Sequence, residues 1–379
     1  MRILYFTRDY SSHDHRFLSA LAKTGHEIYS LRLERCSKQL EDSPLPPEVN
    51  QLNWRGGQGP FAWREAPDLC LAFHQVLRQI QPDLVHAGPV PSVAFLAALS
   101  GARPLVSMSW GSDLLHDIDR DRWQRWCTCF ALQRSRVLLG DCQAVKDKAV
   151  SLGFPAERVK LFPWGVDLDR FVPPPADGVF RGRHGWEDAF VLLSLRSWEP
   201  IYGVDVVVQA FGRAAQQIPD LRLILLGNGS QAGQIRKLIL EYGLEEQVFL
   251  GGQVKNSDLP GYYQAADLYI SASHSDGSSV SLMEALAMGR PVLVSDIPGN
   301  KEWITPEREG WLFTDGDVEA LAAGIVKAYS QRDLRLAEMG AAARLLAEQR
   351  ADWRKNFQVL LEAYQMAVSD SGKRPAGSQ

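Results

Sequence analysis

The chain has 379 residues, of which 45% are hydrophobic and 23% are charged, so its length and composition favour two globular domains with sizeable cores. Its formal net charge of -4 argues against a general nucleic-acid binder, which is usually basic. No stretch of about 18 uncharged apolar residues occurs and the N-terminus, MRILYFTRDY, lacks the apolar core of a signal peptide, so we expect a cytoplasmic protein without a membrane span.

In the first half of the chain, short apolar runs alternate with segments whose apolar residues recur at helical spacing. We expect strands at residues 1–6, 26–33, 82–87, 104–110 and 137–141. We expect helices at residues 15–23, 73–80, 91–101 and 119–136. This alternation predicts βαβ units and a parallel sheet.

A proline-rich polar stretch, VPPPADG at residues 172–178, interrupts the alternation and is interpreted as a linker. Further strands are expected at 189–195, 221–227, 248–252, 266–273 and 291–296, and helices at 204–217 and 230–243. A last helix is expected at about 352–368, and the polar tail 369–379 has the composition of a disordered segment. The pattern therefore predicts an α/β protein with two similar halves.

The five cysteines are odd in number and irregularly spaced: Cys36, Cys70, Cys127, Cys129 and Cys142. Free thiols in a reducing compartment are the expected state, and a metal or redox site is the alternative.

A pair of acids flanks the start of an expected helix in the segment SDGSSVSLMEALAMGRPVLVSD, residues 275–296. Asp276 precedes the helix start near Ser279, and Glu284 lies about one turn inside. The first amides of a helix lack internal partners and carry a positive dipole, so they suit a diphosphate. Carboxylates bind vicinal hydroxyls through charge-assisted hydrogen bonds. The segment therefore suits a nucleotide sugar; the alternative is that Asp276 and Ser279 only cap the helix while Glu284 faces water.

Several further motifs accompany this segment. They are FPWGVDLDRF (162–171), SLRSWEPIYGVDVVVQAF (194–211), LLGNGSQ (225–231), VFLGGQV (248–254), LPGYYQAADLYISAS (259–273) and IPGNKEWI (297–304). In this order, and with the two acids separated by seven residues, the chain resembles the retaining GT-B glycosyltransferases of the large family 4 type. The resemblance covers most of the chain and is strongest from about residue 160 to 315.

The resemblance implies a GT-B fold, in which two Rossmann-like, doubly wound parallel-sheet domains face each other across a cleft. Residues 1–172 would bind the acceptor and residues 180–350 the donor. The helix at about 352–368 would cross back to pack on the first domain.

The resemblance also assigns roles to individual residues. It implies that Asp276 contacts the donor sugar, that Glu284 contacts the nucleotide ribose and that Arg196 contacts the diphosphate. Further donor contacts are expected from Gly229, Gln253, Val254, Gly277, Ser278, Ser279, Val280 and Ser281.

Two positions depart from the family pattern. Asp276 stands where the family usually has Glu, and Ile201 and Tyr202 occupy the positions where a Lys usually follows the Arg. One cationic ligand of the diphosphate is therefore missing, unless Arg290, Lys301 or another residue replaces it, and this departure bears on how strongly the leaving group is stabilised.

Polar residues that follow strands of the first half are candidates for acceptor contacts, because strand ends of an open sheet face the ligand crevice. His13, Asp14, His15 and Arg16 follow the first strand, and His86 follows another. A solvated polar turn is the alternative.

The loop SWGSDLL (109–115) resembles the family's GSD loop near the reaction centre, so Trp110, Gly111 and Asp113 are expected to line the cleft. Trp110 holds the place of a His in many relatives, and we expect shape and stacking from it. Trp164, Trp198 and Trp303 also lie beside motifs, where an indole can stack on a sugar, although core packing is the alternative.

No cofactor or metal is expected. The glycines of LLGNGSQAG miss the G-x-G-x-x-G spacing of a dinucleotide site by one residue, and Asp267, Asp276 and Asp296 form no metal-binding pair. Between Arg103 and Lys160 there are 10 basic and 7 acidic residues, an excess too small to decide between an ordinary solvated face and peripheral membrane contact.

The expected activity is retaining, metal-independent transfer of a sugar from a nucleoside diphosphate sugar to a hydroxyl of a glycan or a lipid-linked saccharide. Two alternatives remain open: a nucleotide-sugar binder without activity, and an epimerase or phosphorylase of the same fold. The residues name neither the sugar nor the base nor the acceptor.

Overall fold

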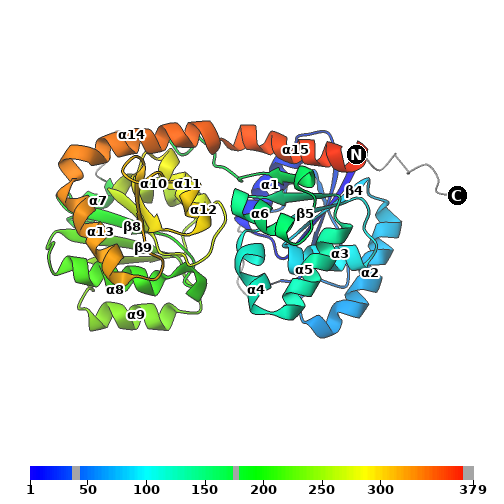
Figure 1. The fold of residues 1–379 in the computed structure, drawn as a ribbon, viewed down its shortest axis with the longest axis horizontal. Coiled ribbons are helices and arrows are strands. Elements are labelled where there is room, and N and C mark those ends of the chain that lie inside the picture. The colour runs from blue at the N-terminus through cyan, green and yellow to red at the C-terminus, as the bar shows by residue number, and fades with distance from the viewer. Residues whose placement is uncertain (36–42, 174–178, 370–379) are drawn as a thin grey trace. The chain divides into compact units, whose positions relative to one another are not determined.

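The computed structural model describes residues 1–35, 43–173 and 179–369. The chain divides into two compact units, of which unit 1 comprises Met1–Phe162 and Phe357–Gln379 and unit 2 comprises Pro163–Asn356. Each unit is built around one parallel β-sheet with helices on both faces (Figure 1). The expected α/β class with two doubly wound halves is therefore confirmed.

The sheet of unit 1 has seven strands in the order β3-β2-β1-β4-β5-β6-β7. The strands are β1 (Arg2–Thr7), β2 (Glu27–Arg32), β3 (Val49–Gln51), β4 (Leu84–Gly88), β5 (Leu105–Met108), β6 (Val137–Gly140) and β7 (Val159–Leu161). The order of the strands reverses between β1 and β4, which makes this pair the topological switch point of the sheet.

The helices of unit 1 follow the alternation expected from the sequence. They are α1 (Ser12–Ala22), η1 (Trp63–Glu65), α2 (Ala66–Ile80), η2 (Val90–Ala94), α3 (Phe95–Leu99), η3 (Asp113–Asp117), α4 (Ile118–Arg120), α5 (Arg122–Arg134), α6 (Gln143–Ser151) and η4 (Ala156–Arg158). The last helix, α15 (Trp353–Ser369), belongs to unit 1 from Phe357 onward.

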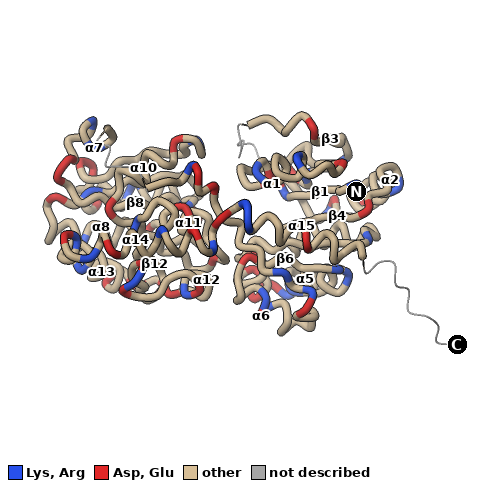
Figure 2. The backbone as a smooth tube through the Cα atoms, turned by 90° about the horizontal axis from the view of Figure 1, so that it is seen from above, with Lys and Arg blue, Asp and Glu red and all other residues tan. Residues whose placement is uncertain are grey.

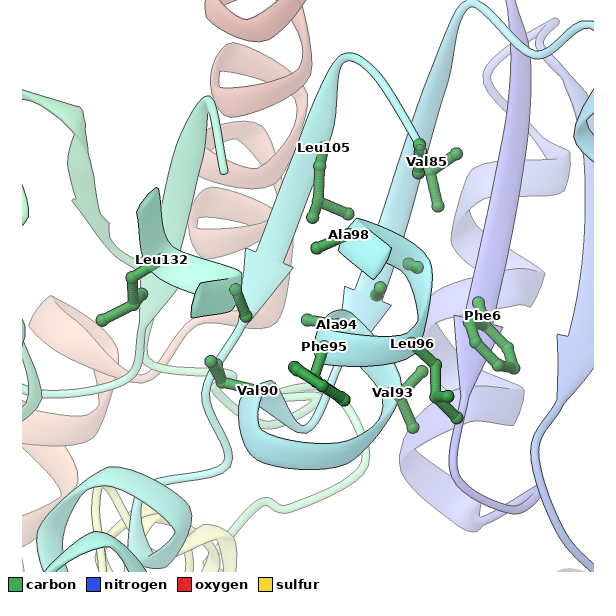
Figure 3. Close-up of a cluster of buried hydrophobic side chains, with 14 of the residues drawn as sticks. Phe6, Val85, Val90, Val93, Ala94, Phe95, Leu96, Ala98, Leu105 and Leu132 are labelled. Atoms are coloured by element: carbon green, nitrogen blue, oxygen red, sulfur yellow. The ribbon is translucent and has the colours of Figure 1, made fainter. Parts of the chain in front are cut away.

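The core of unit 1 on one face of the sheet joins strands to the turn η2 and helix α3. Figure 3 shows side chains from β1, β4 and β5 together with side chains from η2 and α3, all of them buried: Phe6, Val85, Val90, Val93, Ala94, Phe95, Leu96, Ala98 and Leu105. Burial of these apolar side chains fixes the loops that follow the strands.

The sheet of unit 2 has six strands in the order β10-β9-β8-β11-β12-β13, with its switch point between β8 and β11. The strands are β8 (Phe190–Ser194), β9 (Leu221–Leu226), β10 (Val248–Gly252), β11 (Leu268–Ser271), β12 (Val292–Ser295) and β13 (Gly310–Phe313).

Helices cover both faces of this sheet, and successive strand residues alternate between two cores. Phe190 and Leu192 pack in one core with α8 and α13, whereas Val191 and Leu193 pack in the other with α10 and α11. The helices of unit 2 are α7 (Val179–His184), η5 (Pro200–Tyr202), α8 (Val204–Ala215), α9 (Ala232–Glu241), η6 (Asn256–Asp258), α10 (Leu259–Ala265), α11 (Val280–Ala287), α12 (Pro298–Lys301), α13 (Val318–Ser330) and α14 (Arg332–Arg350). Basic and acidic residues are interspersed in both units (Figure 2).

The boundary between the two units lies between Phe162 and Pro163. The sequence pattern predicts it later in the chain, at residue 172. The segment after Phe162 belongs to unit 2, in which Val166 forms a parallel bridge with Asp352. The expected linker falls largely on residues 174–178, which lie outside the described residues, as do Cys36 and residues 370–379 of the expected tail.

Candidate active site

The loops after β8 and β11 meet at the carboxyl edge of the sheet of unit 2, on the two sides of its switch point. Arg196 lies in the loop after β8, and Asp276 lies in the loop after β11. Ligands of open α/β sheets bind at this kind of position. Residues separated by 80 positions of sequence are therefore brought together where a ligand is expected.

The Arg196 guanidinium is held by four neighbours. Its Nη2 lies 2.6 Å from Oδ2 of Asp276, in an ion pair whose side chains are 13% and 14% exposed. Its Nη1 donates to Oγ of Ser279 at 2.8 Å and to Oγ of Ser281 at 3.3 Å. The ring of Tyr202 lies 4.2 Å from the guanidinium carbon. The buried Nε has no hydrogen-bond acceptor among the described residues, so one donor is left over.

Both members of the ion pair respond to burial. Burial raises the pKa of the Asp276 carboxyl, while the Arg196 guanidinium and the Gly277 amide, which donates to Oδ1 at 3.0 Å, oppose that rise. Burial by itself lowers the pKa of Arg196, but the negative field of Asp276 and of neighbouring tyrosines, Tyr202 first, outweighs it and raises this pKa. The guanidinium therefore stays charged, as binding of a diphosphate requires.

Glu284 is buried inside α11 and is only 4% exposed. The hydroxyl of Tyr263 donates to Oε2 of Glu284 at 2.9 Å and to the carbonyl of Ser281 at 2.8 Å. Ser279 stands at the helix start, yet its side chain makes no capping bond and instead accepts from Arg196. The alternative of a capped helix with a solvated Glu284 is therefore wrong.

Glycines allow the loops at this edge to pack closely. A Cβ on Gly203, whose φ is +56°, would lie 2.2 Å from the carbonyl oxygen of Ala272. A Cβ on Gly229 would lie 2.4 Å from the carbonyl oxygen of Trp198. Neither distance is tolerated, so both positions require glycine, and Gly229 lies in the loop after β9 as the sequence predicted.

The remaining donor candidates differ in placement. Gly277 and Ser278 are buried in the loop before α11, and Val280 opens the helix. Gln253 is exposed and Val254 half-buried after β10. No described contact links these last two residues to Arg196, so their role at the nucleotide base stays a prediction.

The two proposed substitutes for the missing lysine lie at different edges of the sheet. Arg290 directly precedes Pro291 and β12, at the amino edge opposite Arg196, so it cannot replace that lysine. Lys301 ends α12 beyond the carboxyl edge, where its Nζ lies 3.4 Å from Oδ2 of Asp296.

Three tyrosines shape the site, although the sequence motifs assigned a binding role to none of them and singled out only Tyr202, as a departure from the family pattern. Tyr202 stacks on Arg196, Tyr263 binds Glu284, and the hydroxyl of Tyr269 lies 2.8 Å from Oγ of Ser281. Tyr263 and Tyr269 belong to the motif LPGYYQAADLYISAS, so this motif was the sequence signal that could have identified them as site residues.

In unit 1, the candidates after β1 lie in a helix and not in a loop. Helix α1 starts at Ser12 because Ser11 and Asp14 form a capping box. Asp14 is buried and also accepts from the hydroxyl of Tyr5 at 2.8 Å, so it serves the fold. His13 and Arg16 are half-buried in the same helix, as is His15, whose Nδ1 lies 2.7 Å from the hydroxyl of Tyr10.

His86 lies within β4 and is 1% exposed. Its Nδ1 lies 2.6 Å from the hydroxyl of Tyr364 in α15, and its ring packs edge-on against Tyr5. Burial lowers the pKa of His86 to about 3, so the imidazole is neutral. This placement fits a structural tether of α15 and corrects the expectation that His86 stands at a strand end.

Asp113 joins the loops after β4 and β5. Its carboxylate accepts from the amides of Val90, Trp110 and Leu114 and from Oγ of Ser109 at 2.6 Å. Burial raises its pKa to about 6, which still leaves it ionised at neutral pH. Asp113 is therefore buried as a positioning residue, while Trp110 is half-buried beside Gly111.

The other tryptophans near motifs are core residues. Trp164, Trp198 and Trp303 are buried. The indole of Trp198 donates to the carbonyl of Leu226 at 3.1 Å, and that of Trp303 donates to Oγ of Ser278 at 2.9 Å. Sugar stacking by these three indoles is not supported by their burial.

Four cysteines fall within the described residues, and all of them are free: Cys70, Cys127, Cys129 and Cys142. Within residues 1–35, 43–173 and 179–369, no helix is long and apolar enough to cross a bilayer, and no cluster of three or more His, Cys, Asp or Glu residues forms a metal-binding group.

Family models match both halves of the chain. The model described as "Glycosyltransferase Family 4" matches residues 12–170, and the model described as "Glycosyl transferases group 1" matches residues 179–346. The chain belongs to the family 4 glycosyltransferases. The resemblance inferred from the sequence motifs is thereby confirmed.

Relatives of this glycosyltransferase share a quarter or more of its residues over the aligned part. The GDP-mannose-dependent alpha-(1-6)-phosphatidylinositol monomannoside mannosyltransferase of Mycolicibacterium smegmatis is 25% identical over 303 residues, which are 76% of this chain and 76% of that protein. The D-inositol 3-phosphate glycosyltransferase of Xylanimonas cellulosilytica is 29% identical over 234 residues, which are 59% of this chain. The match spans only 54% of that second relative.

The crystal structure of HepE from Anabaena in complex with UDP superposes with a TM-score of 0.77 at 19% identity. The superposition covers 96% of this glycosyltransferase and 100% of the HepE chain. It shows that the fold is the GT-B fold.

Proposed function

We propose that this glycosyltransferase moves a sugar from a nucleoside diphosphate sugar to a hydroxyl of a glycan or a lipid-linked saccharide, with retention of the anomeric configuration and without a metal. The observation that carries the proposal is the largely buried cluster of Arg196, Asp276, Ser279 and Ser281 at the switch point of unit 2. This cluster offers a charged guanidinium with a spare donor beside the first amides of α11. Both groups suit a diphosphate.

The proposed reaction breaks the bond between the anomeric carbon and the diphosphate oxygen and forms a bond from that carbon to the acceptor oxygen. The acceptor proton passes to the departing phosphate. The acceptor oxygen attacks the anomeric carbon from the same face that the diphosphate oxygen leaves. A double displacement through Asp276 is not favoured, because its carboxylate is engaged with Arg196 and the Gly277 amide and is not placed as a free nucleophile. Arg196 and the α11 amides stabilise the charge on the leaving group.

The class of donor also draws support from the relatives. The name of the Mycolicibacterium relative specifies GDP-mannose and a phosphatidylinositol-linked acceptor, and HepE was crystallised with UDP. GDP-mannose and UDP both contain a nucleoside diphosphate, so we propose a nucleoside diphosphate sugar as the donor. The experiment described in the Discussion identifies its base.

Retention is tested by following the sugar product by proton NMR in EDTA, with an α-linked donor and water as the acceptor. The α-anomer of the free sugar should appear before the β-anomer. Early β-sugar would contradict retention, and a rate that requires added Mg²⁺ would contradict metal independence. The same spectra identify the rivals: a new epimer of the donor marks an epimerase, and sugar phosphate formed with added phosphate marks a phosphorylase.

Tyr202 is proposed to hold the Arg196 guanidinium in its donor-binding position. Tyr202→Ala is expected to lower kcat for donor cleavage by about 30-fold, because a desolvated cation–π contact of about 2 kcal/mol is lost. Tyr202→Phe keeps the ring and should stay within about twofold of the wild type. Equal rates for the alanine variant and the wild type would rule out this role.

Peripheral membrane contact is proposed at an aromatic patch of unit 1, formed by Trp63, Trp123, Trp126 and Phe130. Trp123 and Trp126 are 45% and 49% exposed, and their rings stack at 5.0 Å between centroids. Helix α5, which carries three of the four residues, contains three arginines and no acid. Exposed indoles beside arginines suit the interface of an anionic bilayer.

Replacing both Trp123 and Trp126 by Gln is expected to weaken co-sedimentation with vesicles that contain phosphatidylglycerol by about tenfold. Leu334→Gln, which changes an exposed apolar residue of unit 2, serves as the matched control and should bind as the wild type does. Unchanged sedimentation of the double variant would refute the patch as the contact.

A further inference from the structure

Unit 2 contains a cavity of about 540 Å³ at the amino edge of its sheet. Its lining includes Phe190 at the start of β8, Asp267 just before β11 and Pro291 just before β12. Because all strands of the sheet are parallel, this edge is opposite the one that carries Arg196 and Asp276. The cavity is thus separate from the proposed donor site, and its volume lies in the range of small-molecule pockets.

The inner wall of the cavity is cationic. Arg181, Arg290 and Arg344 are partly buried there, together with one partly buried acid, Asp267. The rim carries exposed charges of both signs, Glu187, Asp188, Arg332 and Asp333.

Two of the three inner arginines are already satisfied. Nη2 of Arg181 lies 2.7 Å from Oδ1 of Asp267, whose Oδ2 accepts from the amide of Val191. Nη1 of Arg344 donates to the carbonyls of Phe171 and Ala287. Asp267 therefore already binds Arg181 and the Val191 amide, and no hydrogen bond joins it to Arg290 among the described residues.

Arg290 is the third arginine of the inner wall, and it differs from Arg181 and Arg344 in its hydrogen bonding. Its guanidinium has no acceptor among the described residues, and its Nε is buried. Burial lowers the pKa of Arg290, and the positive charge of Arg181 lowers it further, while Asp267 opposes both effects. A partly buried guanidinium without a hydrogen-bond acceptor is stabilised when an anion binds beside it.

The backbone around Arg290 is preformed. A Cβ on Gly340 of α14 would lie 2.4 Å from the carbonyl oxygen of Gly289, so this helix packs directly on the loop that carries Arg290. The cavity wall is thereby fixed by main-chain contact.

We propose that this cavity binds a phosphomonoester, with the phosphate group hydrogen-bonded to Arg290 and further attracted by the positive charges of Arg181 and Arg344. Guanidinium groups bind phosphate oxygens in pairs of parallel hydrogen bonds. The volume exceeds that of phosphate alone, and the rim carboxylates of Glu187, Asp188 and Asp333 are acceptors for hydroxyl groups, so the rest of the ligand carries hydroxyls. A sugar phosphate has this chemistry.

The test uses inorganic phosphate as the probe, because any phosphate-group site should bind it. Phosphate at about 100 times its Kd is expected to raise the unfolding temperature of the full chain by several degrees above a sodium chloride control of equal ionic strength. Arg290→Gln, made in the Arg196→Gln background in which the donor site has lost its cation, should abolish this rise. Arg196→Gln should keep it, which separates the cavity from the donor site whether or not the donor proposal holds.

A second variant covers the case in which Arg290→Gln does not fold. Ala341→Trp places an indole in the cavity from an exposed position of α14 and leaves every charge unchanged. This variant should also lose the stabilisation by phosphate. The proposal is overturned if the wild type is not stabilised, if Ala341→Trp is stabilised like the wild type, or if the effect disappears with Arg196→Gln.

Discussion

Arg196→Gln is expected to lower kcat/KM for donor cleavage by about 10²- to 10³-fold, because the variant loses the charged group that stabilises the leaving diphosphate. The measurement is release of free nucleotide from the donor at several donor concentrations. Arg213→Gln removes a partly exposed arginine of the same unit, which pairs with Glu319 away from Arg196, and should retain wild-type rates. Comparable rates for Arg196→Gln and Arg213→Gln would contradict the assignment.

The same change should destabilise unit 2, which calls for a second variant. Removing one partner of a buried ion pair leaves the other charge uncompensated, at about 3–5 kcal/mol of unfolding free energy. In the double variant Arg196→Gln, Asp276→Asn no charge is left unpaired, so thermal stability should largely return while activity stays lost. Recovery of activity together with stability would show that the single variant failed only through misfolding.

Glu284→Gln is expected to raise KM for the donor by about 10- to 100-fold, because charge-assisted hydrogen bonds to the ribose hydroxyls contribute about 1.5–3 kcal/mol each. Glutamine keeps an oxygen that can accept from Tyr263, so the buried contact at Oε2 is preserved. Steady-state kinetics should show the larger change in KM and the smaller one in kcat.

Tyr263→Phe is the matched comparison for Glu284. It removes the hydroxyl that positions the carboxylate but keeps the ring and the charge of Glu284, so its effect on KM should be clearly smaller. An equal effect of both variants would show that Glu284 acts through the fold and not on the ribose.

The sequence predicted most of the central strands and several helices that form the two cores, but it did not predict α13 and α14, which also contribute to the cores of unit 2. Short edge strands such as β3 and β13 carry too few residues for a pattern, and they form because neighbouring strands offer hydrogen-bond partners. The spacing of apolar residues predicts that α1 begins at His15, but the capping box of Ser11 and Asp14 starts the helix at Ser12.

The sequence could identify residues of the candidate site, but it could not predict which of them contact each other. The motifs named both Arg196 and Asp276, yet no local rule pairs residues that follow β8 and β11, because only the strand order makes these loops neighbours. The stacking of Tyr202 on Arg196 depends on the same arrangement.

His86 illustrates the limit of the rule that polar residues at strand ends face the crevice. Its hydrogen-bond partner, Tyr364, lies 278 positions later in the chain, so burial by α15 could not be read from the segment around β4.

The most direct test of the central claim measures free nucleotide released from UDP-, GDP-, ADP- and dTDP-sugars in EDTA, for the wild type and Arg196→Gln in parallel. We expect release from one donor by the wild type and its loss in the variant. Equal release by both proteins, or neither release nor thermal stabilisation by any donor, would contradict the assignment of the donor site to the carboxyl edge of unit 2.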